Sequence, residues 1–420
     1  MEFVVRTWSA GARLGSMQLA AGVQMETPTL LLLTRKGLPA FIPPDLLQNL
    51  HPDARACQVS PLHFLDSPSA SIVETAGGLH KFVSMTGFGM VALARDSLMD
   101  ESNGEASSKL GAAFETTSGR RVVGPAKYME IVNACKPDLW VSLPDEVPTW
   151  AAEKRNRLSV DRTLQWLDHC LSLQPAERGN RCLGVVVGSA SLDERIRSAE
   201  QTATRNVVGF SLGGFGLGED ASQRALQMDA VIAKLPKEKL RHTSGLGLPD
   251  MPVDHIVTSA EEVLQAVEAG VDVFDSIYPF MLTKGGYAMT FPLNMENSPG
   301  NLDTQPSASE LAYIGSDSAK MNLRSVAYRL DKSPLVVGCK CYTCQRHTRA
   351  YIHHLINTHE MLSQTLLEIH NTYHYLEFFK AIRDAIKADK FLAFRNWFTS
   401  TRKETRVHSP ASKSPTLVLH

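Results

Sequence analysis

Residues 183–212 read LGVVVGSASLDERIRSAEQTATRNVVGFSL, and this stretch decides the fold class. Residues 183–187 form a near-continuous apolar run, which is typical of a strand buried on both faces. Residues 192–205 have the pattern of a helix, and residues 207–212 form the next apolar run. A strand, a helix and a second strand joined by short turns predict two parallel strands in one sheet.

The same alternation continues in both directions. We expect further strands at residues 139–143 and 271–274, and helices at residues 155–173, 221–235 and 260–269. Ser259 is the expected N-cap of the last helix, because Glu262 follows it three positions later. A barrel of eight strand–helix units needs about 250 residues. The sequence therefore predicts an α/β fold of the (β/α)₈ TIM-barrel type, and a doubly wound open sheet is the alternative.

A cluster of three cysteines lies near the C-terminus. Cys339, Cys341 and Cys344 fall within six residues, and His370 follows on a helix predicted for residues 348–379. Three thiols and one imidazole form the ligand set that structural zinc favours, with no position left for a reactive water. The other interpretation is a group of buried free thiols beside a core histidine. We predict one structural Zn²⁺ per chain.

Composition narrows the class of protein. Hydrophobic residues make up 43% and charged residues 21% of the 420 residues, which is typical of soluble globular proteins. No apolar run approaches the roughly 18 residues of a membrane span, so we expect no transmembrane segment. The four other cysteines are scattered, which favours a reducing compartment over a disulfide framework.

Charge is distributed unevenly along the chain. The formal net charge is −1, but residues 320–420 contain 16 Lys and Arg against 7 Asp and Glu. A basic C-terminal region could contact a polyanion. A solvated basic helix face would have the same composition.

Two segments contain residues that could act in catalysis or in ligand binding. Asp275 follows an apolar strand, which in an α/β barrel places its carboxylate at the catalytic face, as a nucleophile or base. It could equally cap a helix or bond within a loop. Residues 209–219, GFSLGGFGLGE, include Gly213 and Gly214. Glycines after a strand let backbone amides approach a planar or anionic ligand, although a tight strand–helix turn also requires them.

Together these segments resemble the tRNA-guanine transglycosylase (queuine tRNA-ribosyltransferase) family over residues 10–395. Cys339, Cys341, Cys344 and His370 match the family's four zinc ligands. Asp275 matches its aspartate nucleophile, residues 209–219 resemble its substrate loop, and Asp145 in Pro-Asp-Glu matches the aspartate that holds the purine edge. The resemblance implies a (β/α)₈ barrel with a zinc subdomain. It also implies exchange of guanine for a 7-deazaguanine base at the tRNA wobble position through a ribosyl–aspartate intermediate.

Three departures from the family pattern bear on activity. Residues 84–90, SMTGFGM, are compared with the family's Asp-Ser-Gly-Gly-Phe-Gln segment and lack its second catalytic carboxylate. Residues 279–286 contain one lysine and no arginine, where the family has an arginine-rich loop that contacts tRNA. Val187 replaces a base-reading glutamine and has no polar atom to offer a purine. These departures resemble the non-catalytic members of the family, so we expect no catalytic residue, with Asp275 retained at the nucleophile position.

The resemblance implies a domain plan and partners. Residues 1–330 would form the barrel, residues 331–398 a zinc-binding helical subdomain that completes it, and residues 399–420 a disordered tail; residues 97–118 would form a flexible loop. The expected partner is a catalytic queuine tRNA-ribosyltransferase subunit, paired largely through the zinc subdomain, with tRNA bound by the heterodimer. The isolated chain could form a homodimer. A cytoplasmic location, peripheral on the mitochondrial outer membrane, is also expected.

Two other functions remain open at this point. The chain could be a self-sufficient transglycosylase that uses Asp275 as nucleophile and another acid, such as Asp145, as base. It could instead be a queuine-binding protein that uses the glycine-rich loop.

Overall fold

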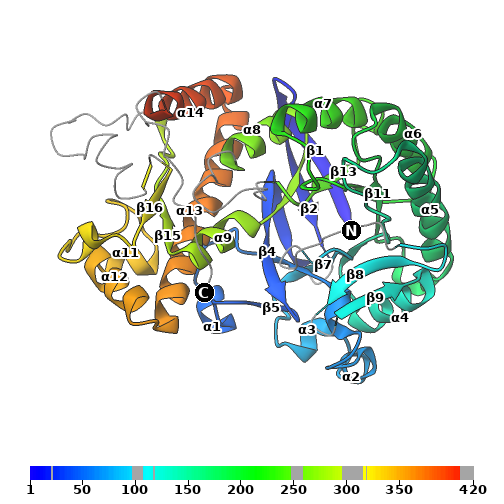
Figure 1. The fold of residues 1–420 in the computed structure, drawn as a ribbon, viewed down its shortest axis with the longest axis horizontal. Helices are drawn as coiled ribbons and strands as arrows, with labels where there is room; N and C mark the ends of the chain where they lie inside the picture. Colours follow the sequence, from blue (N-terminus) through cyan, green and yellow to red (C-terminus); the bar gives the residue numbers. More distant parts are fainter. Residues whose placement is uncertain are drawn as a thin grey trace.

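The computed structural model describes residues 1–19, 22–96, 107–116, 119–246, 259–295, 316–317 and 319–406. Eight parallel strands close into a barrel (Figure 1). In chain order they are β4 (Thr29–Arg35), β6 (Ala56–Val59), β7 (Gly89–Ala92), β10 (Leu139–Val141), β11 (Cys182–Val186), β12 (Gly209–Leu212), β13 (Leu240–Thr243) and β14 (Val273–Asp275). β14 pairs with β4, which closes the sheet. The predicted barrel is confirmed, and the open sheet is excluded.

The barrel interior is filled by side chains from alternate strand positions. Leu183, Val185, Leu240 and Val273 pack there with methionines and leucines from an N-terminal sheet. That antiparallel sheet consists of β1 (Glu2–Ser9), β2 (Ala12–Gln18) and β3 (Gln24–Thr27). It covers the end of the barrel where the strands begin. One end of the barrel is therefore sealed, and the opposite end, where the strands finish, is left for a site.

Amphipathic helices surround the strands, as expected of a barrel. They include α4 (Pro125–Cys135), α5 (Glu153–Ser172), α6 (Leu192–Ala203), α7 (Ala221–Ile232) and α8 (Ser259–Ala269). The predicted helices lie within three residues of these bounds. α8 begins at Ser259, and the capping role predicted for this residue depends on a side chain outside the described part of the structure.

Several short strands and helices lie in the connections between the barrel strands. The short strand β5 (Leu38–Pro39) pairs antiparallel with the end of β4, and α1 (Pro44–Leu47), α2 (Ala70–Thr75) and α3 (Leu79–Phe82) lie in the early connections. β8 (Ala112–Thr116) and β9 (Gly119–Val123) form a hairpin. The hairpin includes residues 112–116 of the loop predicted at residues 97–118, so that prediction is wrong for these five residues. Residues 97–106 and 117–118 lie outside the described residues.

The chain then leaves the barrel and returns to it. After α9 (Ile277–Gly285), β15 (Tyr287–Met289) and β16 (Lys320–Asn322) form a second hairpin, followed by α11 (Tyr342–Arg346) and α12 (Arg349–Asn357). These elements share a separate apolar cluster that includes Leu323, Leu335 and Ile352. We call residues 319–370 the metal subdomain; β15 pairs with its strand β16 but comes earlier in the chain.

The long helix α13 (Met361–Lys387) belongs to both parts. Its first half packs into the metal subdomain, and its second half packs along β14 and β4, where Phe379 lies against Phe274. The sequence predicted one helix over residues 348–379. The structure has two, because the chain turns at residues 358–360, where His359 adopts a left-handed conformation with φ 58°.

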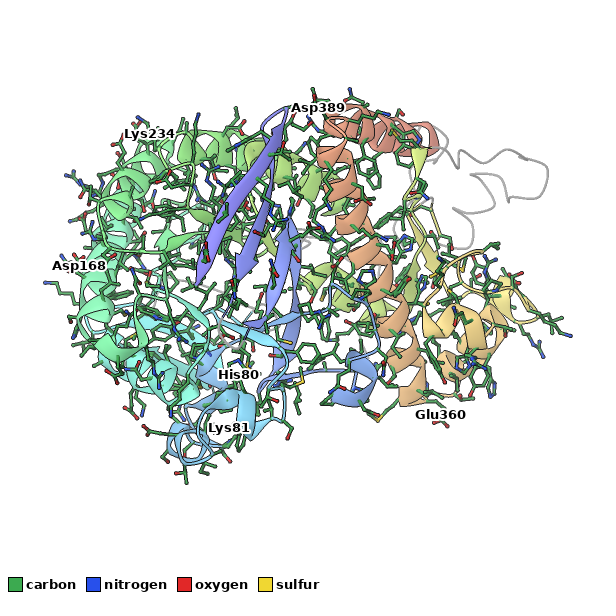
Figure 2. All side chains as sticks on the ribbon, turned by 180° about the vertical axis from the view of Figure 1, so that it is seen from behind. His80, Lys81, Asp168, Lys234, Glu360 and Asp389 are labelled. Carbon is green, nitrogen blue, oxygen red and sulfur yellow. The ribbon has the colours of Figure 1, made fainter. Side chains whose placement is uncertain are left out.

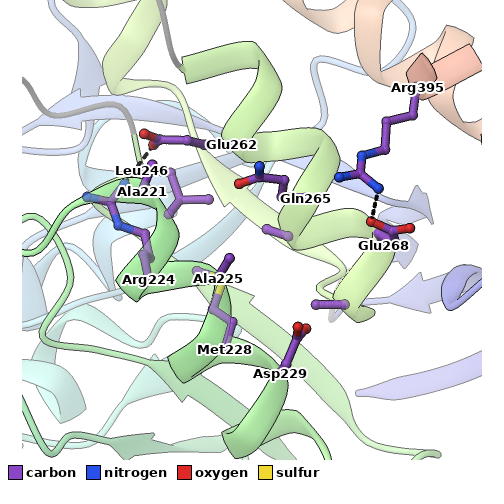
Figure 3. Close-up of a pocket in the computed structure, with 12 residues that line it drawn as sticks. Ala221, Arg224, Ala225, Met228, Asp229, Leu246, Glu262, Gln265, Glu268 and Arg395 are labelled. Atoms are coloured by element: carbon purple, nitrogen blue, oxygen red, sulfur yellow. Dashed lines mark hydrogen bonds and ion pairs between the residues drawn. The ribbon is translucent and has the colours of Figure 1, made fainter. Parts of the chain in front are cut away.

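The last described element is α14 (Phe391–Arg406), which lies beside α8 (Figure 3). Arg395 forms an ion pair with Glu268, and a cavity of about 360 Å³ lies between α7, α8 and this pair. The predicted disordered tail from residue 399 is therefore wrong up to Arg406, and residues 407–420 lie outside the described residues. At the same end of the molecule, Asp389 accepts a hydrogen bond from Ser9 in the N-terminal sheet (Figure 2). Among the described helices, none is long and apolar enough to cross a membrane.

Candidate metal centre and barrel-mouth site

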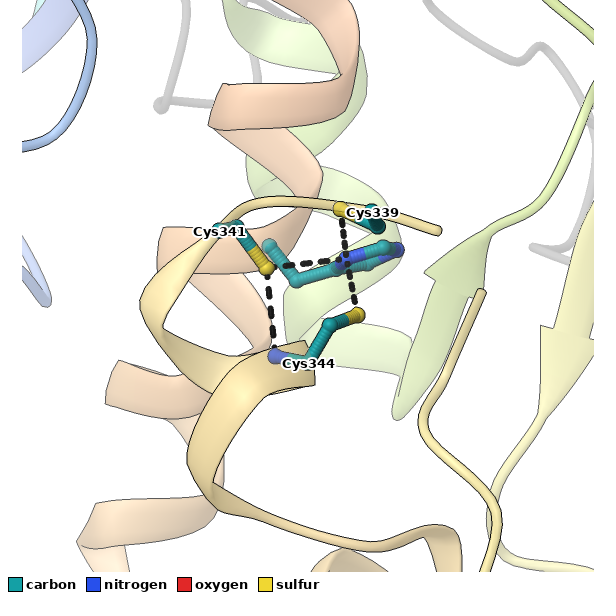
Figure 4. A group of neighbouring side chains, drawn as sticks. Cys339, Cys341 and Cys344 are labelled. Atoms are coloured by element: carbon teal, nitrogen blue, oxygen red, sulfur yellow. Dashed lines mark hydrogen bonds between the residues drawn. The ribbon is translucent and has the colours of Figure 1, made fainter. Parts of the chain in front are cut away.

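The four predicted metal ligands converge on one point (Figure 4). The Sγ atoms of Cys339, Cys341 and Cys344 lie 3.9, 3.5 and 3.4 Å from Nδ1 of His370. All four ligand atoms lie within 4.8 Å of one another. A single ion at their centre would have four protein ligands, which is the arrangement of a structural site.

Local structure holds each ligand in place. Cys341 is the N-cap of α11, where its Sγ accepts a hydrogen bond from the amide of Cys344 at 3.3 Å. His370 is fully buried on α13, and its Nε2 donates to the carbonyl of Met289 at 2.9 Å. That bond places the proton on Nε2 and leaves the lone pair of Nδ1 facing the thiols, as in many metal sites.

Hydrogen bonds among the thiols move two of their pKa values in opposite directions. Bonds with Cys339 and Cys344 raise the pKa of the Cys341 thiol, and bonds with Cys339 and Cys341 lower the pKa of the Cys344 thiol. A divalent cation would favour the thiolate form of all three, because metal binding releases the thiol protons. The cluster can therefore hold a metal ion, as the sequence predicted.

Asp275 lies at the barrel mouth, at the end of β14. Its side chain is 6% exposed, and it accepts hydrogen bonds from the amides of Gly245 at 2.8 Å and Ile277 at 3.3 Å. Burial raises the pKa of this carboxyl to about 6, against smaller lowering effects from the two amides and Arg95. Asp275 is a buried carboxyl near its titration point, which is the environment of a catalytic acid or base.

The resemblance implied that the carboxylate of Asp145 holds a purine, but in the structure it contacts two arginines of this chain. The carboxylate is completely buried and accepts a bidentate hydrogen bond from Arg155, at 2.7 and 2.9 Å. Arg162 adds a third bond at 3.3 Å and also donates to the carbonyl of Ser107. Both arginines come from α5. Three donors from this chain therefore surround the carboxylate that the resemblance assigned to a purine.

Backbone amides of the glycine-rich loop form hydrogen bonds with nearby glutamate side chains of this chain. The amide of Gly214 donates to Glu146, and the amides of Gly216 and Leu217 donate to Glu219. A Cβ atom at Gly213 would lie 2.8 Å from Oε1 of Glu146, so this close approach requires glycine. These amides already have acceptors within the chain.

Arg195 completes the loop from the other side. Its guanidinium donates to the carbonyls of Ser189, Gly213 and Gly214 at 2.7 to 3.1 Å and lies 4.2 Å from the ring centre of Phe215. The side chain is buried, and burial lowers its pKa to about 10. Sequence reasoning included Glu146 and Glu219 in its candidate segments without predicting their contacts, and it missed Arg155 and Arg195, because a charged residue in a helix or loop does not reveal which group it will reach.

The segment compared with the family's second carboxylate lies at the wrong end of its strand. Residues 84–90 precede β7 and end in its first two residues, so Gly87 and Phe88 lie toward the sealed end of the barrel. The residues after β7, at the barrel mouth, include Arg95 and Asp96. Asp96 lies 2.7 Å from Nε2 of His63. The prediction that no acid occupies this region compared the wrong segment, and Asp96 is the acid that follows the strand.

The two other departures concern Val187 and residues 279–286. Val187 is 1% exposed and packs into the barrel interior, so it presents an apolar surface. Residues 279–286 belong to α9 and the glycine that ends it, and Phe280 stacks on Phe41 with ring centres 5.4 Å apart. Lys284 lies over the Phe280 ring, 5.8 Å from its centre.

Comparison with known proteins gives a consistent result. The sequence profile of the family described as Queuine tRNA-ribosyltransferase matches residues 9–404. A protein of Danio rerio named Queuine tRNA-ribosyltransferase accessory subunit 2 is 36% identical over 89% of this chain and 91% of its own length. Proteins of the same name from Homo sapiens and Trichoplax adhaerens are 34% and 32% identical, over 90% and 95% of this chain and 94% and 100% of their own lengths.

Proposed function

Because this chain belongs to the queuine tRNA-ribosyltransferase family, we propose that it is the accessory, non-catalytic subunit of the enzyme that exchanges guanine for queuine at the tRNA wobble position. Three relatives of 32–36% identity are named as accessory subunit 2, and the similarity covers 91–100% of their own lengths. The observation that carries the non-catalytic role is the closed state of Asp145, whose carboxylate is bonded to Arg155 and Arg162. Three donors of this chain thus occupy the carboxylate that would otherwise accept from a base.

A second candidate is a self-sufficient transglycosylase, which one observation favours. Asp275 is a buried carboxyl at the barrel mouth with its pKa raised to about 6, as a retained catalytic group would be. Asp145 is a poor choice for its base, because it is held by two arginines. The third candidate, a queuine-binding protein, is disfavoured since the amides of Gly214, Gly216 and Leu217 already donate to Glu146 and Glu219.

The metal in the Cys₃His cluster is Zn²⁺ in this proposal. Three thiols and one imidazole favour zinc among the common divalent ions, and harder ions such as Mg²⁺ and Ca²⁺ prefer oxygen. Zinc here would be structural, because it would fasten α11 to α13. Since α13 also lines the seam between β14 and β4, the ion would link the fold of the metal subdomain to that of the barrel.

The surface of the metal subdomain is the proposed docking site for the catalytic subunit. It carries strongly exposed apolar residues: Val326, Leu330 and Val337 are 74%, 84% and 80% exposed. Tyr342, His347 and Tyr351 form an aromatic row, with ring centres 5.7 and 5.3 Å apart. Apolar groups rarely gather on a surface without a partner, and aromatic residues are enriched at the centre of interfaces.

The tRNA would be bound by the heterodimer, with the basic C-terminal part of this chain supplying phosphate contacts. Residues 320–420 carry 16 Lys and Arg against 7 Asp and Glu. Such contacts add affinity that falls as salt rises, without reading sequence. The isolated chain would pair with itself through the same apolar surface when the catalytic subunit is absent.

One set of measurements tests this proposal. The purified chain, the catalytic homologue and their mixture are incubated with tRNA carrying labelled guanine at the wobble position, together with queuine. We expect exchange only in the mixture and a one-to-one complex by analytical ultracentrifugation. Exchange by the chain alone, lost in Asp275→Ala, would support the second candidate instead.

The interface is tested with matched surface variants. Leu330→Asp and Tyr351→Ala should weaken the complex at least tenfold, because each lies among the exposed apolar residues of the metal subdomain. Leu226→Asp is the control, since Leu226 is 69% exposed on α7, on the outer wall of the barrel. Equal weakening by all three variants would contradict the proposed site.

A further inference from the structure

The pairing of Arg155 with Asp145 has the geometry of ligand recognition. Two terminal nitrogens of one guanidinium donate to two oxygens of one carboxylate, Nη2 to Oδ1 at 2.7 Å and Nη1 to Oδ2 at 2.9 Å. Two parallel N–H groups on a planar fork thus meet both acceptor atoms at once. Any other planar group with two parallel donors could use the same two acceptors.

A guanine-type base has such an edge. Its ring N1–H and its exocyclic 2-amino group point the same way and are spaced like the two donors of a guanidinium. We propose that Arg155 is an internal occupant of the base site, where it imitates this donor edge and prevents the barrel from binding a free guanine-type base. The inference rests on the proposed function only for the choice of base; the occupation of Asp145 is a property of this chain.

The positions of the side chains fit an occupant. Asp145 has a completely buried side chain, whereas the side chain of Arg155 is 19% exposed. Arg155 is therefore the more exposed partner of the pair, although its Nε atom is buried. Arg162, whose side chain is 11% exposed, bonds only one of the two oxygens, so it cannot replace the fork.

A neutral base cannot readily displace this arginine. Displacing Arg155 would leave the buried charge of Asp145 with only the bond from Arg162, and breaking a largely buried ion pair is strongly unfavourable. The nearby loop reinforces the closed state, because the amides of Gly214 and Gly216 are already bonded to Glu146 and Glu219. The recognition groups at this barrel mouth are therefore satisfied before any ligand arrives.

The test is a gain of binding. Equilibrium dialysis measures uptake of radiolabelled guanine and of hypoxanthine by wild type, Arg155→Ala and Arg157→Ala. Hypoxanthine keeps N1–H but lacks the 2-amino group, so it offers only half of the fork. Arg157 is the matched control, because it is an exposed arginine two positions along the same helix.

Under this proposal, Arg155→Ala binds guanine at least tenfold more tightly than wild type and prefers it to hypoxanthine by about tenfold, the ratio that 1.4 kcal/mol provides. Arg157→Ala behaves as wild type. Guanine binding by wild type as tight as by Arg155→Ala would overturn the proposal. So would equal binding of the two bases by the variant, or no gain in a variant whose thermal unfolding remains cooperative.

A second variant guards against misfolding. Arg155→Lys keeps the charge but has a single nitrogen that cannot span both oxygens, and it should bind guanine at least threefold more tightly than wild type. No gain in this folded variant also contradicts the proposal. Complex formation with the catalytic homologue is measured separately, so loss of the complex bears on the proposed function, and absent base binding bears on Arg155 alone.

Discussion

Replacing Asp275 with asparagine should stabilise the folded chain at neutral pH, and the gain should shrink as the pH falls. Burial raises the pKa of Asp275 to about 6 from an ordinary value of 3.8. The folded state thus binds this proton more tightly than the unfolded state. Stability therefore decreases as the pH rises from about 4 to above 6, and the full penalty is present at pH 8.

The size of the effect follows from the two pKa values. A shift of about two units corresponds to about 3 kcal/mol at pH 8, and at pH 5 about half of that remains. Asparagine carries no charge, but its single carbonyl oxygen cannot accept from both Gly245 and Ile277. The lost bond offsets about 1 kcal/mol. We expect Asp275→Asn to gain about 2 kcal/mol at pH 8 and less than 1 kcal/mol at pH 5.

Urea unfolding followed by circular dichroism at pH 5 and pH 8 measures both values. Asp384→Asn serves as the control, because Asp384 is exposed on α13 and its removal should change stability little at either pH. A stability difference between Asp275→Asn and wild type that is the same at pH 5 and pH 8 would refute the reasoning. Destabilisation at pH 8 would do so as well.

Three further predictions concern the rest of the molecule. Elemental analysis should find about one zinc per chain. Cys341→Ser should lose this zinc and melt at a lower temperature, whereas Cys57→Ser in the barrel wall should keep its metal. Arg13→Ala should lower the urea-unfolding free energy by about 3–5 kcal/mol, since it leaves a buried carboxylate unpaired, whereas the exposed Arg6→Ala should cost less than about 1 kcal/mol. Arg195→Ala should speed amide hydrogen exchange in the glycine-rich loop, because that loop loses two carbonyl partners; unchanged exchange would show that the loop is held by other contacts.

Periodicity predicted the barrel because each parallel strand and its helix leave independent marks in the sequence. The run at residues 183–187 had to be buried on both faces, and β11 (Cys182–Val186) is. The break between α12 and α13 could not be found in this way. The apolar spacing continues through the turn, and His359 adopts its left-handed conformation through tertiary context.

The metal site was predictable because its ligands are rare residue types at a specific spacing. The barrel mouth was not. Whether Asp145 faces a ligand or an arginine depends on where α5 places Arg155 and Arg162, ten and seventeen positions later. The comparison at residues 84–90 failed for a related reason: a glycine pattern shows that a turn is present, but it does not show which end of the strand the turn follows.

The two aspartates at the barrel mouth, Asp145 and Asp275, have opposite electrostatic environments. This contrast bears on whether Asp275 only survives from an active ancestor or still acts in the reaction. Asp145 is neutralised by arginines, so it supports the fold, whereas Asp275 is held by backbone amides at a cost in stability. Groups that lower stability usually persist where function needs them. If Asp275 only survives from an active ancestor, Asp275→Asn should leave queuine exchange by the proposed heterodimer unchanged while stabilising the chain. If exchange by the heterodimer instead falls at least tenfold while the complex still forms, Asp275 acts in the reaction, and this chain contributes more than assembly.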